Sequence, residues 1–138
     1  MDIFAHSSSD YLFVKNMNLY EIQSIEKGED TAKCTLLLNA KHEVYKGHFP
    51  GMPILPGALQ VEMIKEVFGT VLEKKMRLSS AKSIKYLGFI NPNENPNLVF
   101  NFKYSFTDDA WNLRASVSDT QEEKPQLFMK FSGIFIEA

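Results

Sequence analysis

Apolar and polar residues alternate along the second half of the chain with the period of β-strands. The clearest alternation covers residues 98–106, where one face is largely aromatic, and a second covers residues 111–118. A period of two predicts strands that bury one face. Because Asp108 and Asp109 lie between the two segments, we expect them to form the turn of a β-hairpin.

Four further segments have strand-like patterns, and polar or turn-forming residues separate them. These strands are expected at residues 11–22, 31–38, 83–90 and 127–136, with turns or loops at 26–30, 91–96 and 119–125. Residues 1–10 are polar and serine-rich, so we expect a loosely ordered arm there.

One segment has helical periodicity instead. Residues 57–74 carry apolar side chains on nearly every side, which predicts a long and largely buried helix. The segment just before it, residues 47–57, holds three of the six prolines and three of the seven glycines. Proline and glycine restrict such a loop to an irregular path, and Pro56 suits the start of a helix.

These elements predict an α+β fold in which a curled antiparallel sheet of about six strands wraps around one long central helix. The 138 residues are 44% hydrophobic, as expected for a single domain over residues 1–138. No apolar segment reaches 18 residues and the first residues do not resemble a signal peptide, so we expect a cytoplasmic protein without a membrane span. The formal net charge of −2 argues against nucleic acid as a partner.

Few residue types offer metal or redox chemistry. The single cysteine, Cys34, excludes an internal disulfide and any cysteine-built metal site, and is expected to be a small buried hydrophobe. A cluster of cations, Lys74, Lys75 and Arg77 with Lys82 and Lys85, is the best candidate for meeting an anionic partner. A solvated helix end explains the first three equally well.

Two ionisable residues point to proton-transfer chemistry. Glu62 lies in the second turn of the apolar helix, where a carboxylate needs a partner or a task. His48 lies in the stiff loop before that helix. An imidazole exchanges protons near neutral pH, a carboxyl in apolar surroundings can give or take a proton, and helix N-terminal N–H groups stabilise a developing oxyanion. Taken alone, His48 is more often structural than catalytic, and Glu62 is open between the two.

The loop and helix closely resemble the active-site segment of the 3-hydroxyacyl-(acyl-carrier-protein) dehydratases of the FabZ type. The resemblance rests on Gly47-His48-Phe49-Pro50-Gly51, Pro53-Ile54, Pro56-Gly57 and Glu62, on the lead-in at residues 42–46, and on the later segment at residues 85–94. It extends over about residues 17–136.

This resemblance implies the hotdog fold and the reversible dehydration of a 3-hydroxyacyl thioester to the trans-2-enoyl thioester. It assigns His48 as the base on the α-carbon, Glu62 as the group that helps the hydroxyl leave, and the N–H of Gly57 as the donor to the carbonyl oxygen. It implies no metal and no cofactor, since the substrate is carried on the phosphopantetheine of an acyl carrier protein. It also implies a homodimer in which His48 meets Glu62 of the neighbouring chain; a trimer of dimers, or a heterodimer with a related subunit, remains open.

The chain departs from the family pattern in several places. Glu66 stands where the family usually carries glutamine, so two carboxylates repel at i and i+4 and one is expected to hold its proton to higher pH. Lys65 lies roughly 100° around the helix and is not expected to compensate. Leu87 and Gly88 replace paired basic residues, which indicates a specialised pathway, such as polyene or polyketide synthesis, in place of primary fatty-acid synthesis.

Several apolar residues are candidates for lining an acyl tunnel, although each is equally well explained as core. They are Met52, Ile54, Leu55, Met63, Phe89 and Ile90. Two other functions compete with dehydration. A hotdog thioesterase hydrolyses the same class of thioester but lacks the His-Phe-Pro-Gly loop, and a non-catalytic dehydratase-like subunit would bind an acyl carrier or an active partner.

Overall fold

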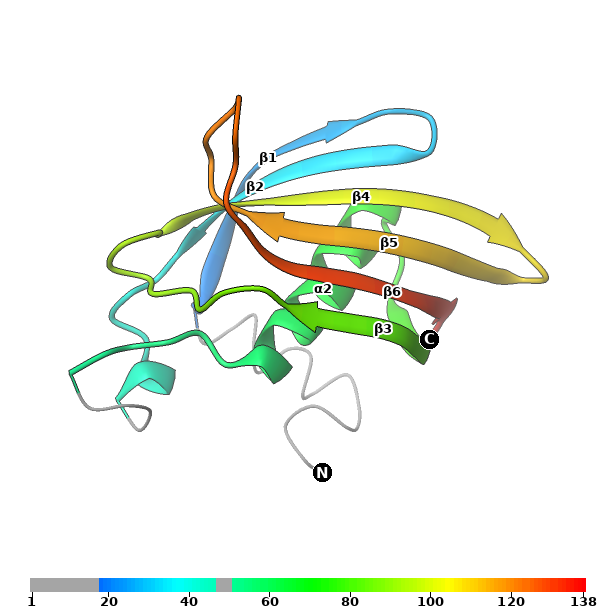
Figure 1. The fold of residues 1–138 in the computed structure, drawn as a ribbon. Helices are drawn as coiled ribbons and strands as arrows, with labels where there is room; N and C mark the ends of the chain where they lie inside the picture. The colour runs from blue at the N-terminus through cyan, green and yellow to red at the C-terminus, as the bar shows by residue number, and fades with distance from the viewer. Residues whose placement is uncertain (1–17, 47–50) are drawn as a thin grey trace.

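The computed structural model describes residues 18–46 and 51–138. Within these residues the chain forms six strands, one long helix and one short 3-10 turn, labelled in Figure 1. The elements are β1 (Tyr20–Lys27), β2 (Thr31–Leu38), η1 (Glu43–Tyr45), α2 (Gly57–Leu72), β3 (Met76–Tyr86), β4 (Asn97–Thr107), β5 (Ala110–Ser118) and β6 (Leu127–Glu137).

The six strands form a single antiparallel sheet that curls over one face of α2 (Figure 1). Its spatial order is β1-β2-β4-β5-β6-β3, so β1 and β3 are the two edge strands. The α+β prediction of a curled sheet around a central helix is therefore confirmed. A helix that is apolar on most sides is buried only when a sheet bends around it, and this explains the curvature.

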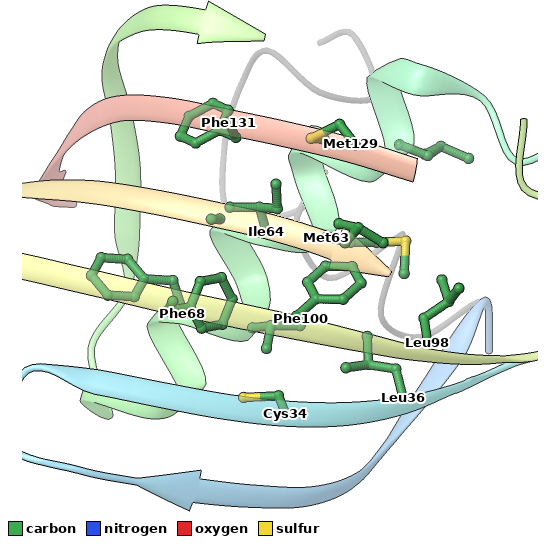
Figure 2. Close-up of a cluster of buried hydrophobic side chains, with 14 of the residues drawn as sticks. Cys34, Leu36, Met63, Ile64, Phe68, Leu98, Phe100, Met129 and Phe131 are labelled. Atoms are coloured by element: carbon green, nitrogen blue, oxygen red, sulfur yellow. The ribbon is translucent and has the colours of Figure 1, made fainter. Parts of the chain in front are cut away.

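The core lies between α2 and the inner face of the sheet. Phe68 of α2 lies at its centre, with ring centroids 5.8 Å from Phe102, 5.3 Å from Tyr104 and 5.7 Å from Phe135. Figure 2 shows side chains from β2, β4 and β6 directed at the same helix face. Aromatic pairs tilted at such distances add to the stabilisation from apolar burial, so the aromatic face of β4 has found the partner that its pattern required.

Both ends of α2 fall where sequence signals place them. The helix begins at Gly57 after Pro56, as predicted, and it ends at Leu72, two residues before the predicted end. Glu73 adopts the left-handed conformation with φ 55° and its N–H bonds back to Gly69 and Thr70, which stops the helix. Lys27 Nζ donates to the Val71 carbonyl at 3.1 Å, placing a cation at the negative end of the helix.

The hairpin between β4 and β5 is also as predicted. Asp108 and Asp109 have φ of 54° and 60°, and Thr107 pairs with Ala110 across the turn. Two successive residues with positive φ match the twist of the flanking strands. The strand predicted at residues 83–90 was placed too late in the sequence. The observed strand β3 spans Met76–Tyr86, and residues 87–90 lie outside any strand.

The remaining strand predictions differ at the N-terminal end. Glu26 and Lys27, expected in a turn, belong to β1, and the strand-like residues 12–14 lie outside the described residues. Cys34 is fully buried, as expected, and desolvation raises the pKa of its thiol to about 11. Among residues 18–46 and 51–138, no helix has the length and apolar character needed to cross a membrane.

Candidate active site

The N-terminus of α2 has no side-chain cap on its first N–H groups. Pro56, the residue before the helix, has no side chain that can cap the first N–H groups. Gly57 leaves room for the ring of Tyr86, since a Cβ on Gly57 would lie 2.7 Å from Tyr86 Cζ. Tyr86 therefore covers the first helical residue from the end of β3. The helix start thus offers N–H groups and a positive dipole end beside a phenol ring.

A hollow of about 580 Å³ lies at this end of the helix. It is lined by Ile54, Leu55, Pro56, Gly57, Gln60, Tyr86, Leu87, Gly88 and Phe89. Its volume lies in the range of small-molecule sites, and its lining is mostly apolar. A backbone bond of 2.9 Å from Leu55 N–H to the Ile90 carbonyl joins the two segments that form its walls.

Gln60 connects the helix to the loop before it. Its side chain is 3% exposed, and Nε2 donates to the Leu55 carbonyl at 3.2 Å. This bond fixes the amide orientation, because a flipped amide would bring two oxygens together. Oε1 is then a buried acceptor that has no hydrogen-bond partner among the described residues. Gln60 therefore holds residues 53–56 against the helix.

Glu62 is buried on α2, with 6% of its surface exposed. Lys65 Nζ lies 2.5 Å from Glu62 Oε1 and forms an ion pair with it. The sequence did not require Lys65 to compensate, but it does so for Glu62, because residues three apart on a helix are neighbours. The buried carboxylate thus has a cation beside it, as a buried charge requires.

Glu66 is buried more deeply, at 1% exposed, one turn after Glu62. The hydroxyl of Tyr20 on β1 donates to Glu66 Oε1 at 2.6 Å. The two carboxylates of the helix therefore have different partners, a lysine for Glu62 and a phenol for Glu66. Different surroundings are what allow neighbouring carboxyl groups to differ in role.

His48, the predicted base, lies outside the described residues, so its role stays a prediction. The segment leading to it is described as far as Lys46. There His42 caps η1 by accepting the Val44 N–H on Nδ1 at 2.9 Å. The imidazole of His42 thus fixes the turn from which the chain proceeds toward His48.

The six candidates for an acyl tunnel occupy three kinds of position. Ile54, Leu55 and Phe89 line the hollow at the helix start, and Phe89 is 74% exposed there. Met63 and Ile90 are fully buried and belong to the core cluster, where Figure 2 labels Met63. Met52 is 54% exposed. The tunnel role stays a prediction for all six.

Three residues of this region were not identified from the sequence. Tyr20 and Tyr86 come from strands far from the helix in sequence, and no spacing rule relates them to Glu66 or Gly57. Gln60 did carry a signal, since an amide in the first turns of an almost wholly apolar helix requires a partner. In the described residues, no group of three or more histidine, cysteine or carboxylate side chains is placed to hold a metal ion.

The sheet around a single helix, with a hollow at the helix N-terminus, defines the hotdog class of proteins. A family model described as ApeI-like, ApeI dehydratase, matches residues 24–124, which is more than half of the chain. The chain therefore belongs to the ApeI-like dehydratase family, and the FabZ resemblance of its loop and helix agrees with this.

Individual relatives and solved structures share low sequence identity with this chain. FabZ of Acinetobacter baylyi, a 3-hydroxyacyl-(acyl-carrier-protein) dehydratase, is 27% identical over 112 residues, which are 80% of this chain and 65% of that protein. The first curated relatives are matched over about half of their length, 48% and 44%. Among solved structures, the dehydratase heterocomplex ApeI:P from Xenorhabdus doucetiae has a TM-score of 0.65 at 18% identity, covering 85% of this chain and 97% of that one.

Proteins of another activity share the fold. A hypothetical thioesterase with coenzyme A from Streptococcus pneumoniae has a TM-score of 0.58 at 13% identity, covering 95% of this chain and 98% of that one. At such identities the likeness concerns the fold alone, and the residues of the site must separate the two activities.

Proposed function

We propose that this chain removes water from a 3-hydroxyacyl thioester to give the trans-2-enoyl thioester. The observation that carries the proposal is the start of α2 at Gly57, which has no side-chain cap and adjoins an apolar hollow of about 580 Å³ on a helix that also buries Glu62. Elimination next to a thioester carbonyl needs an oxyanion donor, an acid or base, and an apolar place for the acyl chain. Membership of a dehydratase family supports the same reaction.

Each catalytic residue has one role in this proposal. His48 takes the proton from the α-carbon, and the electron pair moves to form the double bond as the bond from the β-carbon to oxygen breaks. Glu62 supplies the proton with which the hydroxyl leaves as water, directly or through a bound water. The N–H of Gly57 stabilises the negative charge on the thioester oxygen, helped by the helix dipole.

The substrate is proposed to arrive on the phosphopantetheine of an acyl carrier protein. The FabZ relatives are named as dehydratases of 3-hydroxyacyl groups on an acyl carrier protein, and this supports an acyl carrier protein over coenzyme A. The pathway is fatty-acid, polyene or polyketide synthesis in the cytoplasm. No metal and no resident cofactor takes part in the proposed chemistry.

We also propose that the site is completed between two subunits, in a homodimer or in a heterodimer with a related chain. Strand β3 supports this, because it is an edge strand whose residues Ile84 and Tyr86 are 38% and 51% exposed. An unprotected edge strand with exposed apolar residues is suited to pairing with another chain. The ApeI:P structure is itself a heterocomplex.

One spectrophotometric assay tests the reaction against its two rivals. The protein is mixed with a short trans-2-enoyl pantetheine thioester, and the conjugated absorbance and free thiol are followed together. Loss of absorbance without thiol release is expected. Thiol release would instead support a thioesterase, which the S. pneumoniae neighbour makes the second candidate, and neither signal would support a non-catalytic subunit.

Variants of the proposed residues test the roles. His48→Ala and Glu62→Gln are each expected to lower kcat at least about a hundredfold, the range for loss of one acid–base group. If the site joins two subunits, mixing and refolding the two inactive variants restores about a quarter of the wild-type activity, since half of the dimers then hold one intact site. Full activity in either variant alone would remove that residue from the mechanism.

A further inference from the structure

The outer face of the sheet, which does not touch α2, carries two rows of polar residues that cross neighbouring strands in register. Pairing from strand to strand aligns one row as Glu26, Lys33, Asn101, Ser116, Lys130 and Lys85. The second row is Thr31, Lys103, Arg114, Ser132 and Ser83. Alternation along each strand places both rows on one face, two residues apart.

Within these rows, cations lie directly opposite cations. Lys103 on β4 pairs with Arg114 on β5, and Lys130 on β6 pairs with Lys85 on β3. Like charges in directly opposed positions of a sheet are destabilising. A surface selected only for solubility would more often place an acid at one position of each pair. The arrangement therefore costs stability, and this favours a function for the charge.

The five cations of this face are exposed, and of them only Lys33 lies opposite an acid, Glu26, in the strand pairing of the described residues. Among the described residues, no ion pair joins Lys33, Lys85, Lys103, Arg114 or Lys130 to a carboxylate. The acids that line this part of the sheet, Glu26 and Asp30, lie at its β1–β2 margin. On a chain with a formal net charge of −2, one face is thus strongly basic.

These cations surround a hollow of about 640 Å³, shallow and open to solvent. Asn101, Ser116 and Ser132 lie between them and add polar groups to a lining that also includes Ala32, Phe102, Ala115 and Phe131. The cations extend from β2 to β3, four strand spacings or about 19 Å. The structure thus presents a broad basic trough, which we name the outer basic face, defined by the five cations.

We propose that the outer basic face is a docking surface for an acidic protein. A second copy of this chain is disfavoured, because the same cations would face one another. A small phosphorylated ligand fits less well, because such sites enclose most of their ligand, and this trough is open. Four of the five cations are lysines, whose mobile ammonium groups suit electrostatic steering better than bidentate recognition.

The position of the face links this proposal to the site described above, and the link rests on the proposed function. Lys85 immediately precedes Tyr86, which lines the hollow at the helix start. An acidic carrier protein docked on the trough would lie beside the segment that leads to that hollow. Of the cations expected from the sequence to meet an anion, Lys85 belongs to the face, whereas Lys74 pairs with Glu137 at 3.5 Å.

The test measures binding of an acyl carrier protein of net negative charge to variants of this chain in which two lysines are replaced by glutamate. Lys103→Glu and Lys130→Glu each place an acid opposite a remaining cation, so thermal stability should be unchanged or higher. The matched control is Lys75→Glu combined with Lys124→Glu, the same total charge change at two exposed positions outside the trough. We expect the double variant to weaken binding of the carrier protein at least tenfold, as measured by calorimetry, and the control to bind as wild type does.

Kinetics separate this inference from the proposed function. The double variant should raise KM for a 3-hydroxyacyl carrier protein at least tenfold, and leave kcat/KM for the pantetheine thioester of the same acid unchanged. Turnover of neither thioester would refute the proposed function, while the binding experiment would still decide the docking surface. Equal carrier binding by wild type and the double variant would overturn the inference. So would tight binding of ADP or coenzyme A that the double variant loses while carrier binding persists, which would make the face a small-anion site.

Discussion

The hydroxyl of Tyr20 on β1 donates a 2.6 Å hydrogen bond to Oε1 of Glu66 on α2. This contact joins an edge strand to the buried centre of the helix across 46 positions of sequence. Because Glu66 is only 1% exposed, this bond is shielded from water, which makes it stronger than the same bond at the surface. Glu66 departs from the FabZ pattern that the helix resembles, and here a tyrosine on β1 meets its carboxylate.

Tyr20→Phe is expected to lower the free energy of unfolding by about 1–3 kcal/mol, because a buried carboxylate loses a donor. Denaturant unfolding at neutral pH measures the loss. In the Glu66→Gln background, Tyr20→Phe should lower the free energy of unfolding by less, because a neutral amide depends less on the phenol as a hydrogen-bond donor. Equal costs in both backgrounds would show that the phenol and carboxylate are not coupled.

Glu66→Gln is expected to change the pH dependence of kcat/KM, because a titratable group one turn from Glu62 is removed. The profile is measured between pH 5 and 9 with the pantetheine thioester, on wild type and variant in parallel. Glu73→Gln, the same change at an exposed helix end, is the control and should leave the profile as it is. If Glu66→Gln also leaves it unchanged, the second carboxylate has no part in the chemistry.

Gly57→Ala is expected to move Tyr86, because the new methyl group would lie 2.7 Å from the phenol ring. The ring is half exposed and can turn outward, so the loss of stability should stay below about 1 kcal/mol. The free-energy barrier of the reaction should rise by more than the free energy of unfolding falls, because the displaced Tyr86 ring no longer lines the hollow at the helix start. In a Tyr86→Ala background, Gly57→Ala should have no further effect on stability; a large additional loss would mean that the backbone itself resists the substitution.

The parts of the fold that could be predicted are those fixed by local pattern. The start of α2 follows from Pro56-Gly57, and the hairpin follows from two aspartates between alternating segments. Strand β3 could not be placed correctly for a physical reason. Much of it is exposed at the edge of the sheet, so its residues show little alternation of apolar and polar positions.

The candidate site divides in the same way. The place of Glu62 on the buried helix could be predicted from helical spacing, and the start of that helix from Pro56-Gly57. The Tyr20–Glu66 bond and the contact of Tyr86 with Gly57 depend on which strands the fold brings to the helix, and no local pattern contains that information. The Lys65–Glu62 pair lies at i,i+3 and could have been inferred from spacing.

Cys34 gives a prediction about stability at high pH. Burial raises the pKa of its thiol from 9.0 to about 11, so the unfolded chain loses this proton at a lower pH than the folded chain does. Stability should therefore fall as the pH rises from about 9 to about 11, by up to ~3 kcal/mol from this group. Unfolding experiments across this range measure the slope. Cys34→Ala should show a shallower slope over the same interval; parallel curves would mean that the thiol titrates alike in both states.

Gln60 allows the geometry at the helix start to be tested with a single change of atom type. In Gln60→Glu a carboxylate oxygen replaces the amide nitrogen that now donates to the Leu55 carbonyl at 3.2 Å, so two oxygens meet in a buried place. At neutral pH this should lower the free energy of unfolding by about 1–3 kcal/mol. As the pH falls, the introduced carboxyl gains a proton and can donate to Leu55, so the loss should shrink.

The matched variant is Gln60→Met, which has a similar length and no hydrogen-bonding nitrogen. It also loses the bond to Leu55, but it removes the buried Oε1 that lacks a partner among the described residues. Its cost should therefore be small and independent of pH between 4 and 8. A constant difference between the two variants over this range would show that the side chain of residue 60 does not donate to the loop. The Leu55 segment would then owe its place beside the hollow to the backbone bond with Ile90 alone.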